Sequence, residues 1–307
     1  CGGTNRGYTY DANGFIETKT DWNGNVTSYV RDDMGRIQEK TIAAGTEAAK
    51  TTAYDYHPTL KLKTQIDLHQ SEGIATPIIK STSIVYYGDE AGEEYWEGLV
   101  KSRTITDPST GESRTVSYTY YGEAGDENGN GARQLKTVDG PRTDVQDIIT
   151  YTYDAKGNLK TTTNALGHIS EIIEADGAGR PLIIEDANDV QTVLTYTPRG
   201  WLKTSTHQNN TTEYIYDNVG NVTDIISPDG STITYTYDDA NRLTDITDKH
   251  DNTIHYELNA MGGITEQQIK DPQGVLNMVR STVRDELNRI KHSIGANVEE
   301  DIETNYD

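Results

Sequence analysis

The sequence predicts an all-β fold, a repetitive array of antiparallel β-hairpins that coils as a spiral, with about 21 residues in each two-strand unit. Three observations predict it. A motif of the form Tyr-Asp-x-x-Gly recurs at nearly constant spacing, tyrosines recur in pairs two residues apart, and turn-forming sequences interrupt the chain about every ten to twelve residues.

The composition predicts order with a thin core. Hydrophobic residues make up 33% of the 307 residues, and 27 Lys and Arg face 49 Asp and Glu, which gives a net charge of −22. Such a balance is typical of disordered chains. However, 20 tyrosines and many threonines and isoleucines are the residues that strands favour. We therefore expect β-sheet structure with few fully buried side chains.

The repeat is clearest between positions 151 and 262, where the Gly or Asn that ends each motif recurs at 157, 179, 200, 220, 241 and 262. A looser series of turns, such as Ser227-Pro228-Asp229-Gly230, lies between these motifs. The strands are therefore short. The expected structural residues of the repeat are Tyr10, Asp11, Gly14, Asp32, Gly35, Tyr153, Asp154, Gly157, Leu159, Tyr216, Asp217, Gly220, Tyr237, Asp238, Asn241 and Leu243.

The turn chemistry explains these residue types. Asp accepts hydrogen bonds from backbone N–H groups of the turn, and the last turn position needs a positive φ, which Gly tolerates best and Asn next. A type I turn followed by such a residue forms a hairpin with a bulge. The resulting register places Tyr153 opposite Leu159 and Tyr237 opposite Leu243.

Pairs of tyrosines predict an aromatic stripe. Residues two apart on a strand share a face of the sheet, so both rings of a pair point the same way. The stripe would pack against Leu, Ile or Val of neighbouring strands. The pairs occupy positions 8 and 10, 54 and 56, 118 and 120, 151 and 153, 214 and 216, and 235 and 237.

We expect residues 1–307 to form a single repeat array, with long hairpin loops at about 86–98 and 121–134 and a frayed end or a continuation at 295–307. No run approaches the about 18 apolar residues of a membrane span. The acidic balance argues against nucleic-acid binding. The single cysteine, Cys1, excludes internal disulfides, and it is either a lipidated N-terminus or the point at which a longer chain was cut.

The motif Tyr-Asp-x-x-Gly-Asn/Arg-Leu resembles the YD repeat, or RHS repeat, family from about Tyr8 to Ile290. Its relatives include RHS polymorphic toxins, the B and C components of insecticidal toxin complexes, and teneurins. The resemblance implies an antiparallel sheet that winds into a hollow shell, often around a toxin polypeptide. It therefore implies a structural scaffold, the wall segment of a larger secreted bacterial RHS-type protein. We find no counterpart of the family's self-cleaving C-terminal core segment.

On this interpretation the partners are other parts of the same longer chain, neighbouring copies, or an enclosed toxin polypeptide. The alternative is a filament or adhesin at the cell surface that associates through unpaired edge strands or binds carbohydrate. Trp22, Trp96 and Trp201 could stack on sugars, although packing within the sheet is the simpler interpretation. Both alternatives place the protein outside the cell, secreted or at the surface.

No common catalytic signature occurs, including Gly-x-Ser-x-Gly, His-Glu-x-x-His and the phosphate-binding loop, so we expect neither an enzyme nor a cofactor. One segment resembles a metal site. Asp126, Asn128 and Asn130 match the first half of a calcium-binding loop, but Thr137 stands where that loop needs Glu. The segment is either a weak calcium site or a plain hairpin tip.

Overall fold

A computed structural model of the chain describes residues 7–21, 24–88, 90–285, 288–295 and 302–303. Within these residues the regular structure is β-strand, apart from one short 3-10 helix, η1 (Glu94–Trp96). The predicted all-β array of antiparallel hairpins is therefore confirmed. Cys1, Trp22 and most of 295–307 lie outside the described residues. The chain divides into two compact units, Cys1–Ser170 and Glu171–Asp307.

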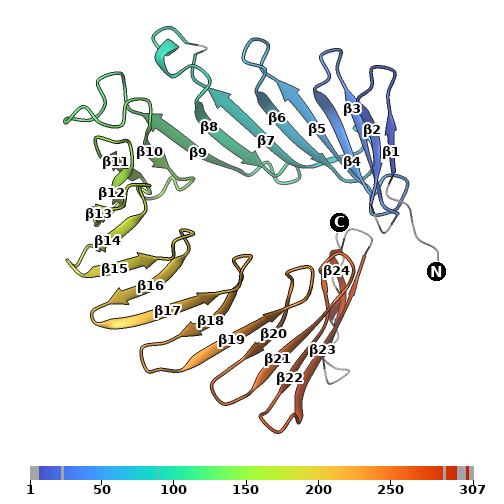
Figure 1. Cartoon of the computed structure of the whole chain (residues 1–307). Helices are drawn as coiled ribbons and strands as arrows, with labels where there is room; N and C mark the ends of the chain where they lie inside the picture. The colour runs from blue at the N-terminus through green and yellow to red at the C-terminus, as the bar shows by residue number, and fades with distance from the viewer. Residues whose placement is uncertain (1–6, 22–23, 89, 286–287, 296–301, 304–307) are drawn as a thin grey trace. The chain divides into compact units, whose positions relative to one another are not determined.

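In the first unit the consecutive strands from β1 to β12 form antiparallel pairs, β1 with β2 through to β11 with β12 (Figure 1). Residues 87–99 connect β7 to β8 and residues 121–134 connect β9 to β10, each within an antiparallel pair. The strands are β1 (Gly7–Tyr10), β2 (Ile16–Thr20), β3 (Val26–Arg31), β4 (Ile37–Ile42), β5 (Lys50–Tyr56), β6 (Lys63–His69), β7 (Ile78–Tyr86), β8 (Val100–Thr106), β9 (Ser113–Tyr120), β10 (Leu135–Asp139), β11 (Ile149–Tyr153) and β12 (Leu159–Thr163).

The second unit follows the same rule from β13 to β25. Its strands are β13 (Ile169–Ala175), β14 (Pro181–Glu185), β15 (Gln191–Tyr196), β16 (Leu202–His207), β17 (Asn210–Tyr216), β18 (Val222–Ile226), β19 (Thr232–Tyr237), β20 (Leu243–Thr247), β21 (Thr253–Leu258), β22 (Ile264–Lys270), β23 (Leu276–Arg284), β24 (Ile290–Ile294) and β25 (Ile302–Glu303).

The register at the turns is the one that the turn chemistry predicts. Tyr153 pairs with Leu159 and Tyr237 with Leu243, and the register shifts by one residue next to each tyrosine, as a bulge requires. The last turn position has a positive φ in each motif, for example +83° at Gly157. Asn241 adopts +58°, which shows that Asn serves where Gly is absent.

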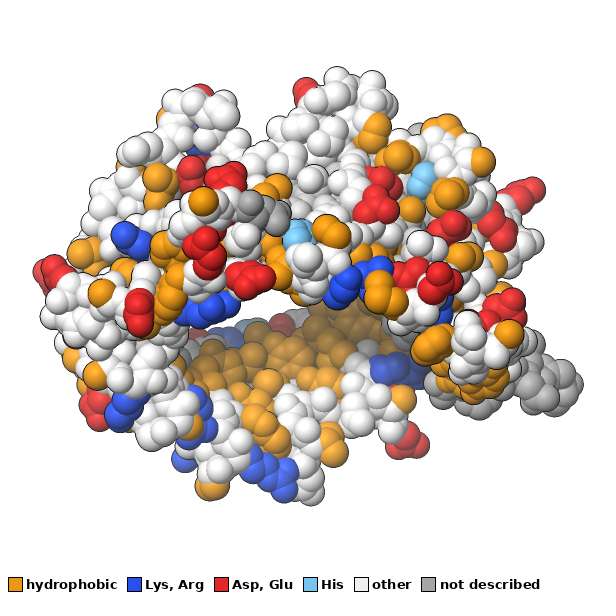
Figure 2. Space-filling view, turned by 90° about the horizontal axis from the view of Figure 1, so that it is seen from above, with side chains coloured by type: hydrophobic (Ala, Val, Ile, Leu, Met, Phe, Trp, Pro, Cys, Tyr) orange, Lys and Arg blue, Asp and Glu red, His pale blue; other side chains and the backbone are white. Residues whose placement is uncertain are grey.

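The core is thin, as the composition predicts. One of the few fully buried side chains is Thr51, whose hydroxyl pairs with that of Thr41 at 2.7 Å and accepts a hydrogen bond from the Gly73 N–H, also at 2.7 Å. Many large hydrophobic side chains stay exposed, and Figure 2 shows them at the surface between acidic and basic ones. Stability must therefore come mainly from contacts between neighbouring hairpins.

Candidate functional site

The repeated turn is held by both oxygens of its aspartate. In the turn after β19, Oδ1 of Asp238 accepts hydrogen bonds from the N–H groups of Ala240 at 2.9 Å and Arg242 at 3.0 Å. Oδ2 of Asp238 accepts from Nε of Arg242 at 2.7 Å and forms an ion pair with its Nη2 at 2.6 Å. One carboxylate therefore closes the backbone of the turn and fixes the residue four positions later.

The residue after Gly in the motif thus has a role that the sequence analysis did not assign. In many turns it is Arg or Asn, and in the pairs named below it donates to Oδ2 of the aspartate. The alternation of these two donors four residues after Asp is the sequence signal that could have revealed the role. The pairs are Arg36 with Asp32, Arg180 with Asp176, Arg242 with Asp238, Arg289 with Asp285, Asn25 with Asp21, Asn158 with Asp154, Asn221 with Asp217, and Asn252 with Asp248.

These hydrogen bonds favour the ionised form of several turn aspartates. The side-chain hydrogen bond from Arg242 and the backbone N–H groups hold the pKa of Asp238 below its ordinary value. The side-chain hydrogen bond from Asn158 does the same for the pKa of Asp154. In the second series of turns, the hydroxyl and N–H of Ser231, followed by Lys249, lower the pKa of Asp229 to about 2. Folding therefore stabilises the ionised form of these carboxyl groups over the protonated form.

A tyrosine hydroxyl joins most hairpins to the hairpin before them. In each link, the tyrosine that ends the first strand of a hairpin donates its hydroxyl to a backbone carbonyl of the preceding hairpin. The acceptor is the first residue of that hairpin's second strand, as when Tyr216 at the end of β17 donates to Leu202 at the start of β16 at 2.7 Å. We call this set of bonds the tyrosine ladder. Its members are Tyr56 to Ile37, Tyr86 to Lys63, Tyr120 to Val100, Tyr153 to Leu135, Tyr196 to Pro181, Tyr216 to Leu202, and Tyr237 to Val222.

Other residues occupy the ladder position in some hairpins. Arg284 replaces tyrosine in β23, and its Nε donates to the carbonyl of Ile264 at 2.9 Å, so a guanidinium can provide the same link. In β3 the position is held by Arg31, whose guanidinium carbon lies 5.5 Å from the centre of the Phe15 ring. Ala175 and Leu258 carry no side-chain donor. In most hairpins the last residue of the first strand therefore provides a donor that reaches the neighbouring hairpin, in addition to the ring packing that the sequence predicted.

Removing one ladder hydroxyl should weaken the array locally. We expect Tyr216→Phe to lower the free energy of unfolding by about 0.5–1.5 kcal/mol, the usual net contribution of a hydrogen bond, because the ring packing is retained. Urea unfolding followed by circular dichroism measures this change. Tyr214→Phe is the matched control on the same strand. Equal losses in both variants would contradict the role assigned to the Tyr216 hydroxyl.

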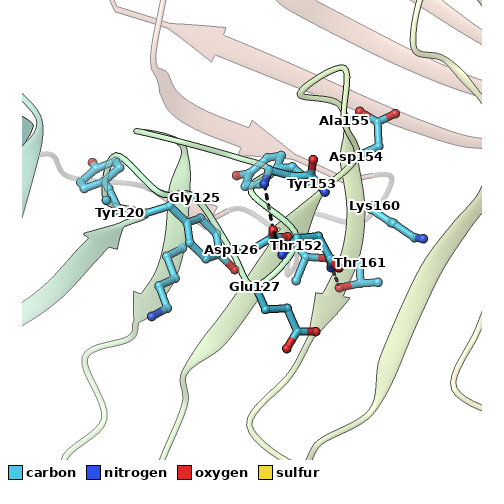
Figure 3. A pocket seen from close by; sticks show the side chains of 15 residues that line it. Tyr120, Gly125, Asp126, Glu127, Thr152, Tyr153, Asp154, Ala155, Lys160 and Thr161 are labelled. Carbon is cyan, nitrogen blue, oxygen red and sulfur yellow. Dashed lines mark hydrogen bonds between the residues drawn. The ribbon is translucent and has the colours of Figure 1, made fainter.

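The second long loop borders an open pocket of about 840 Å³ in the first unit. Asp126 and Glu127 reach it from the loop, and Thr152 and Thr161 reach it from β11 and β12, where their hydroxyls pair at 2.6 Å (Figure 3). Three tyrosines of the pocket wall already donate their hydroxyls to backbone carbonyls: Tyr120, Tyr121 and Tyr153. The pocket is therefore a polar cleft, and the charged side chains of Asp126, Glu127 and Lys136 are among those that line it.

The calcium-like segment at this pocket folds as another turn of the repeat type. Oδ1 of Asp126 accepts from the N–H groups of Asn128 at 2.8 Å and Asn130 at 2.9 Å, and Gly129 has a φ of +79°. Oδ1 of Asp126 thus accepts the same two backbone hydrogen bonds as Oδ1 of Asp154 and Asp238. Across the described residues, no three His, Cys, Asp or Glu side chains are grouped so as to hold a metal ion.

Calcium is therefore expected to have little effect on stability. Adding 1 mM calcium should shift the melting temperature by less than about 2 °C, because Oδ1 of Asp126 is already directed at two backbone N–H groups. Differential scanning calorimetry with calcium and with a chelator measures the shift, and Asp126→Asn is the control. A large shift that a chelator reverses, and that Asp126→Asn abolishes, would instead establish a calcium site.

The described tryptophans are engaged in packing. Trp96 donates its Nε1–H to the carbonyl of Tyr121 at 3.0 Å, so the loop 87–99 is joined to the loop 121–134. Trp201 lies beside the ring of Tyr216, with centroids 5.2 Å apart, and the guanidinium of Arg199 lies 5.3 Å from the centre of the Trp201 ring. An open pocket of about 430 Å³ borders Trp201. Sugar stacking, the weaker alternative to packing, stays a proposal for Trp201.

Comparisons with known proteins agree with this architecture. The RHS Repeat family model matches residues 216–253. A chain of the crystal structure of TcdB2-TccC3 superposes with a TM-score of 0.56 at 19% identity, covering 94% of this chain and 17% of that one. A chain of the TcdB2-TccC3-TEV structure gives 0.50 at 18% identity, with coverage of 94% and 17%. No curated protein sequence matches.

The match at residues 216–253 coincides with two repeat turns and two rungs of the tyrosine ladder, those of Tyr216 and Tyr237. The structural similarity extends over nearly the whole chain, although this chain spans about a sixth of the chains that it resembles. The comparisons indicate no catalytic family. The resemblance to the YD-repeat or RHS-repeat family is therefore confirmed: the chain carries an RHS repeat at residues 216–253 and shares the fold of the TcdB2-TccC3 chains.

Proposed function

We propose that the chain is a non-catalytic YD-repeat scaffold, a wall segment of a hollow β-shell in a larger secreted bacterial RHS-type protein that encloses or delivers a toxin polypeptide. The tyrosine ladder is the observation that carries this proposal. It repeats one link between successive hairpins, and such a link supports an extended wall rather than a single binding site. The similarity to TcdB2-TccC3 supports the same role.

The sheet chemistry also supports a scaffold. Most described hairpins place a polar turn at the strand ends, and in many of these turns an aspartate accepts hydrogen bonds from the backbone, so the wall stays hydrated without a large core. No helix among the described residues combines the length and apolarity needed to cross a membrane. On this proposal the partners are the remaining parts of the longer protein and the enclosed polypeptide.

The proposal is tested on the native protein. Its mass should be much larger than 34 kDa. Electron micrographs should show a hollow particle. Limited proteolysis should reach the enclosed polypeptide only after the particle is opened. Polymers assembled from units of about 34 kDa would contradict the shell. They would favour the filament or adhesin instead.

The pocket beside Trp201 favours carbohydrate binding as the second candidate function, because aromatic side chains and the polar groups of Arg199, Lys203 and Glu213 meet there. Glycan-array binding that Trp201→Ala abolishes would support it. The existing contacts of Trp201 with Tyr216 and Arg199 explain the same aromatic cluster by packing alone, and for this reason the scaffold comes first.

A further inference from the structure

We propose that the open pocket between the loop 121–134 and strands β11 and β12 binds a neutral saccharide through the hydroxyl groups of the sugar. The inference goes beyond the scaffold role, and it concerns a site separate from the pocket beside Trp201. It rests on a floor that the repeat provides, a wall that a loop outside the repeat adds, and side chains of both charges that line the pocket.

The floor of the pocket is a pair of threonines that belongs to the repeat. Thr152 in β11 and Thr161 in β12 lie opposite each other, and their hydroxyls pair at 2.6 Å. Each hydroxyl has one hydrogen to donate and two lone pairs, so a pair that shares one hydrogen keeps the other hydrogen and several lone pairs. Both residues line the pocket, where these groups can bind a ligand hydroxyl as donor or as acceptor (Figure 3).

The loop 121–134 makes this threonine pair different from its counterpart elsewhere in the repeat. Thr195 and Thr204 occupy the same repeat positions in β15 and β16, and their hydroxyls also pair at 2.6 Å. Thr195 is exposed, whereas Thr152 and Thr161 are half-buried. The long loop therefore encloses a polar surface that the repeat elsewhere leaves open to water.

The wall of the pocket is preformed. The Tyr121 hydroxyl donates to the carbonyl of Tyr151 at 2.8 Å, and the Tyr121 side chain is buried. At the other end of the loop, Nε2 of Gln134 donates to the carbonyl of Gly157 at 2.8 Å. A preformed wall loses little conformational entropy when a ligand binds. The volume of about 840 Å³ also lies in the range of about 300–1,000 Å³ that is usual for ligand pockets.

The charged side chains of the pocket define the class of ligand. Carboxylates of Asp126, Glu127 and Asp154 accept hydrogen bonds, and the ammonium groups of Lys136 and Lys160 donate them. A sugar carries adjacent hydroxyls that donate and accept, so it satisfies both kinds of group. Because the carboxylates are not outnumbered by the ammonium groups, an anionic ligand gains no net attraction, and the sugar should be neutral.

Glu127 is the carboxylate that we expect to bind the sugar. Oδ1 of Asp126 and Oδ1 of Asp154 each accept two backbone hydrogen bonds within their turns. Glu127 lies between the two residues whose N–H groups Asp126 holds and its own turn aspartate, and its side chain is exposed. Its carboxylate can therefore accept hydrogen bonds from a ligand without opening a turn.

The test uses this chain and three neutral trisaccharides: maltotriose, cellotriose and chitotriose. Titrations followed by saturation-transfer-difference NMR should show saturable binding of at least one of them, with a Kd of about 0.1–1 mM. Glu127→Gln should weaken this binding about tenfold, because it removes a hydrogen bond to a charged acceptor. Thr152→Val should weaken it about three- to tenfold, the effect of one net hydrogen bond.

Thr195→Val is the matched control, because it breaks the equivalent threonine pair outside the pocket. It should lower the melting temperature as Thr152→Val does, yet leave the affinity unchanged. Absence of binding by all three sugars, or binding that neither Glu127→Gln nor Thr152→Val weakens, would overturn the proposal. Tighter binding of trigalacturonate, an acidic trisaccharide, would also overturn it.

Binding that Trp201→Ala abolishes and Glu127→Gln leaves intact would place the sugar at the other pocket, and this result too would overturn the proposal. Sugar binding and the shell are measured separately. A native protein that forms no shell therefore leaves the binding result interpretable, and the reverse holds as well.

Discussion

Gly220→Ala should destabilise the second unit strongly, and Gly157→Ala should destabilise the first unit much less. Both glycines have a positive φ, +103° at Gly220 and +83° at Gly157, so any side chain adds strain of about 1 kcal/mol or more. Gly220 also lies against Trp201, and a Cβ there would be 2.8 Å from Cζ2 of the indole ring. The nearest atoms at Gly157 belong to the Gln134 side chain, 3.6 Å or more away.

The difference between the two variants isolates the contact with Trp201. We expect losses of about 1 kcal/mol for Gly157→Ala and about 2–4 kcal/mol for Gly220→Ala, because overpacking adds to backbone strain. Urea unfolding of each variant measures the losses. Gly220→Ala combined with Trp201→Leu should recover part of the loss if the clash is the cause. Equal losses at the two glycines would show that Trp201 moves aside at little cost.

The repeat, its turns and its register could be predicted from the sequence because they depend on residues close together in the chain. Asp, Gly and the bulge fix one hairpin within a few positions, so Tyr153 opposite Leu159 follows from local chemistry. Because the motif recurs along the chain, the same local prediction then applies to each repeat. The thin core follows from composition in the same way.

The ladder and the joined loops could not be predicted in this way. The Tyr216 hydroxyl bonds a carbonyl 14 residues earlier in sequence, and that contact depends on how two hairpins are aligned side by side. Likewise, Arg133 donates to the carbonyls of Tyr95 and Glu97, which lie 38 and 36 residues away in the other long loop. Such links become visible only when the register of every intervening strand is known. The calcium-like segment was ambiguous because Asp and Asn serve both metal sites and turns.

Acid should unfold the array cooperatively, and the turn aspartates are the reason. Several of them, including Asp154, Asp176 and Asp238, have a lower pKa in the folded chain than in the unfolded chain. A carboxyl of this kind contributes stability that is fully present above its unfolded pKa and is lost as the pH falls through its folded pKa. For Asp229, whose folded pKa is about 2, the loss extends to that pH. Because many turns respond together, the melting temperature should fall steeply below about pH 4.

Asp238→Asn separates the charge of the carboxylate from its geometry. Asn already occupies this position in other turns, where Oδ1 of Asn164 accepts from the N–H groups of Leu166 at 2.9 Å and His168 at 3.0 Å. The variant should therefore keep the turn but lose the ion pair with Arg242, so it should be less stable than the unchanged chain at pH 7. At about pH 2 the Asp238 carboxylate is increasingly protonated and so becomes neutral like Asn, and the difference should shrink. Melting curves at both pH values measure this, and a constant difference would show that the charge of Asp238 does not contribute to the acid sensitivity.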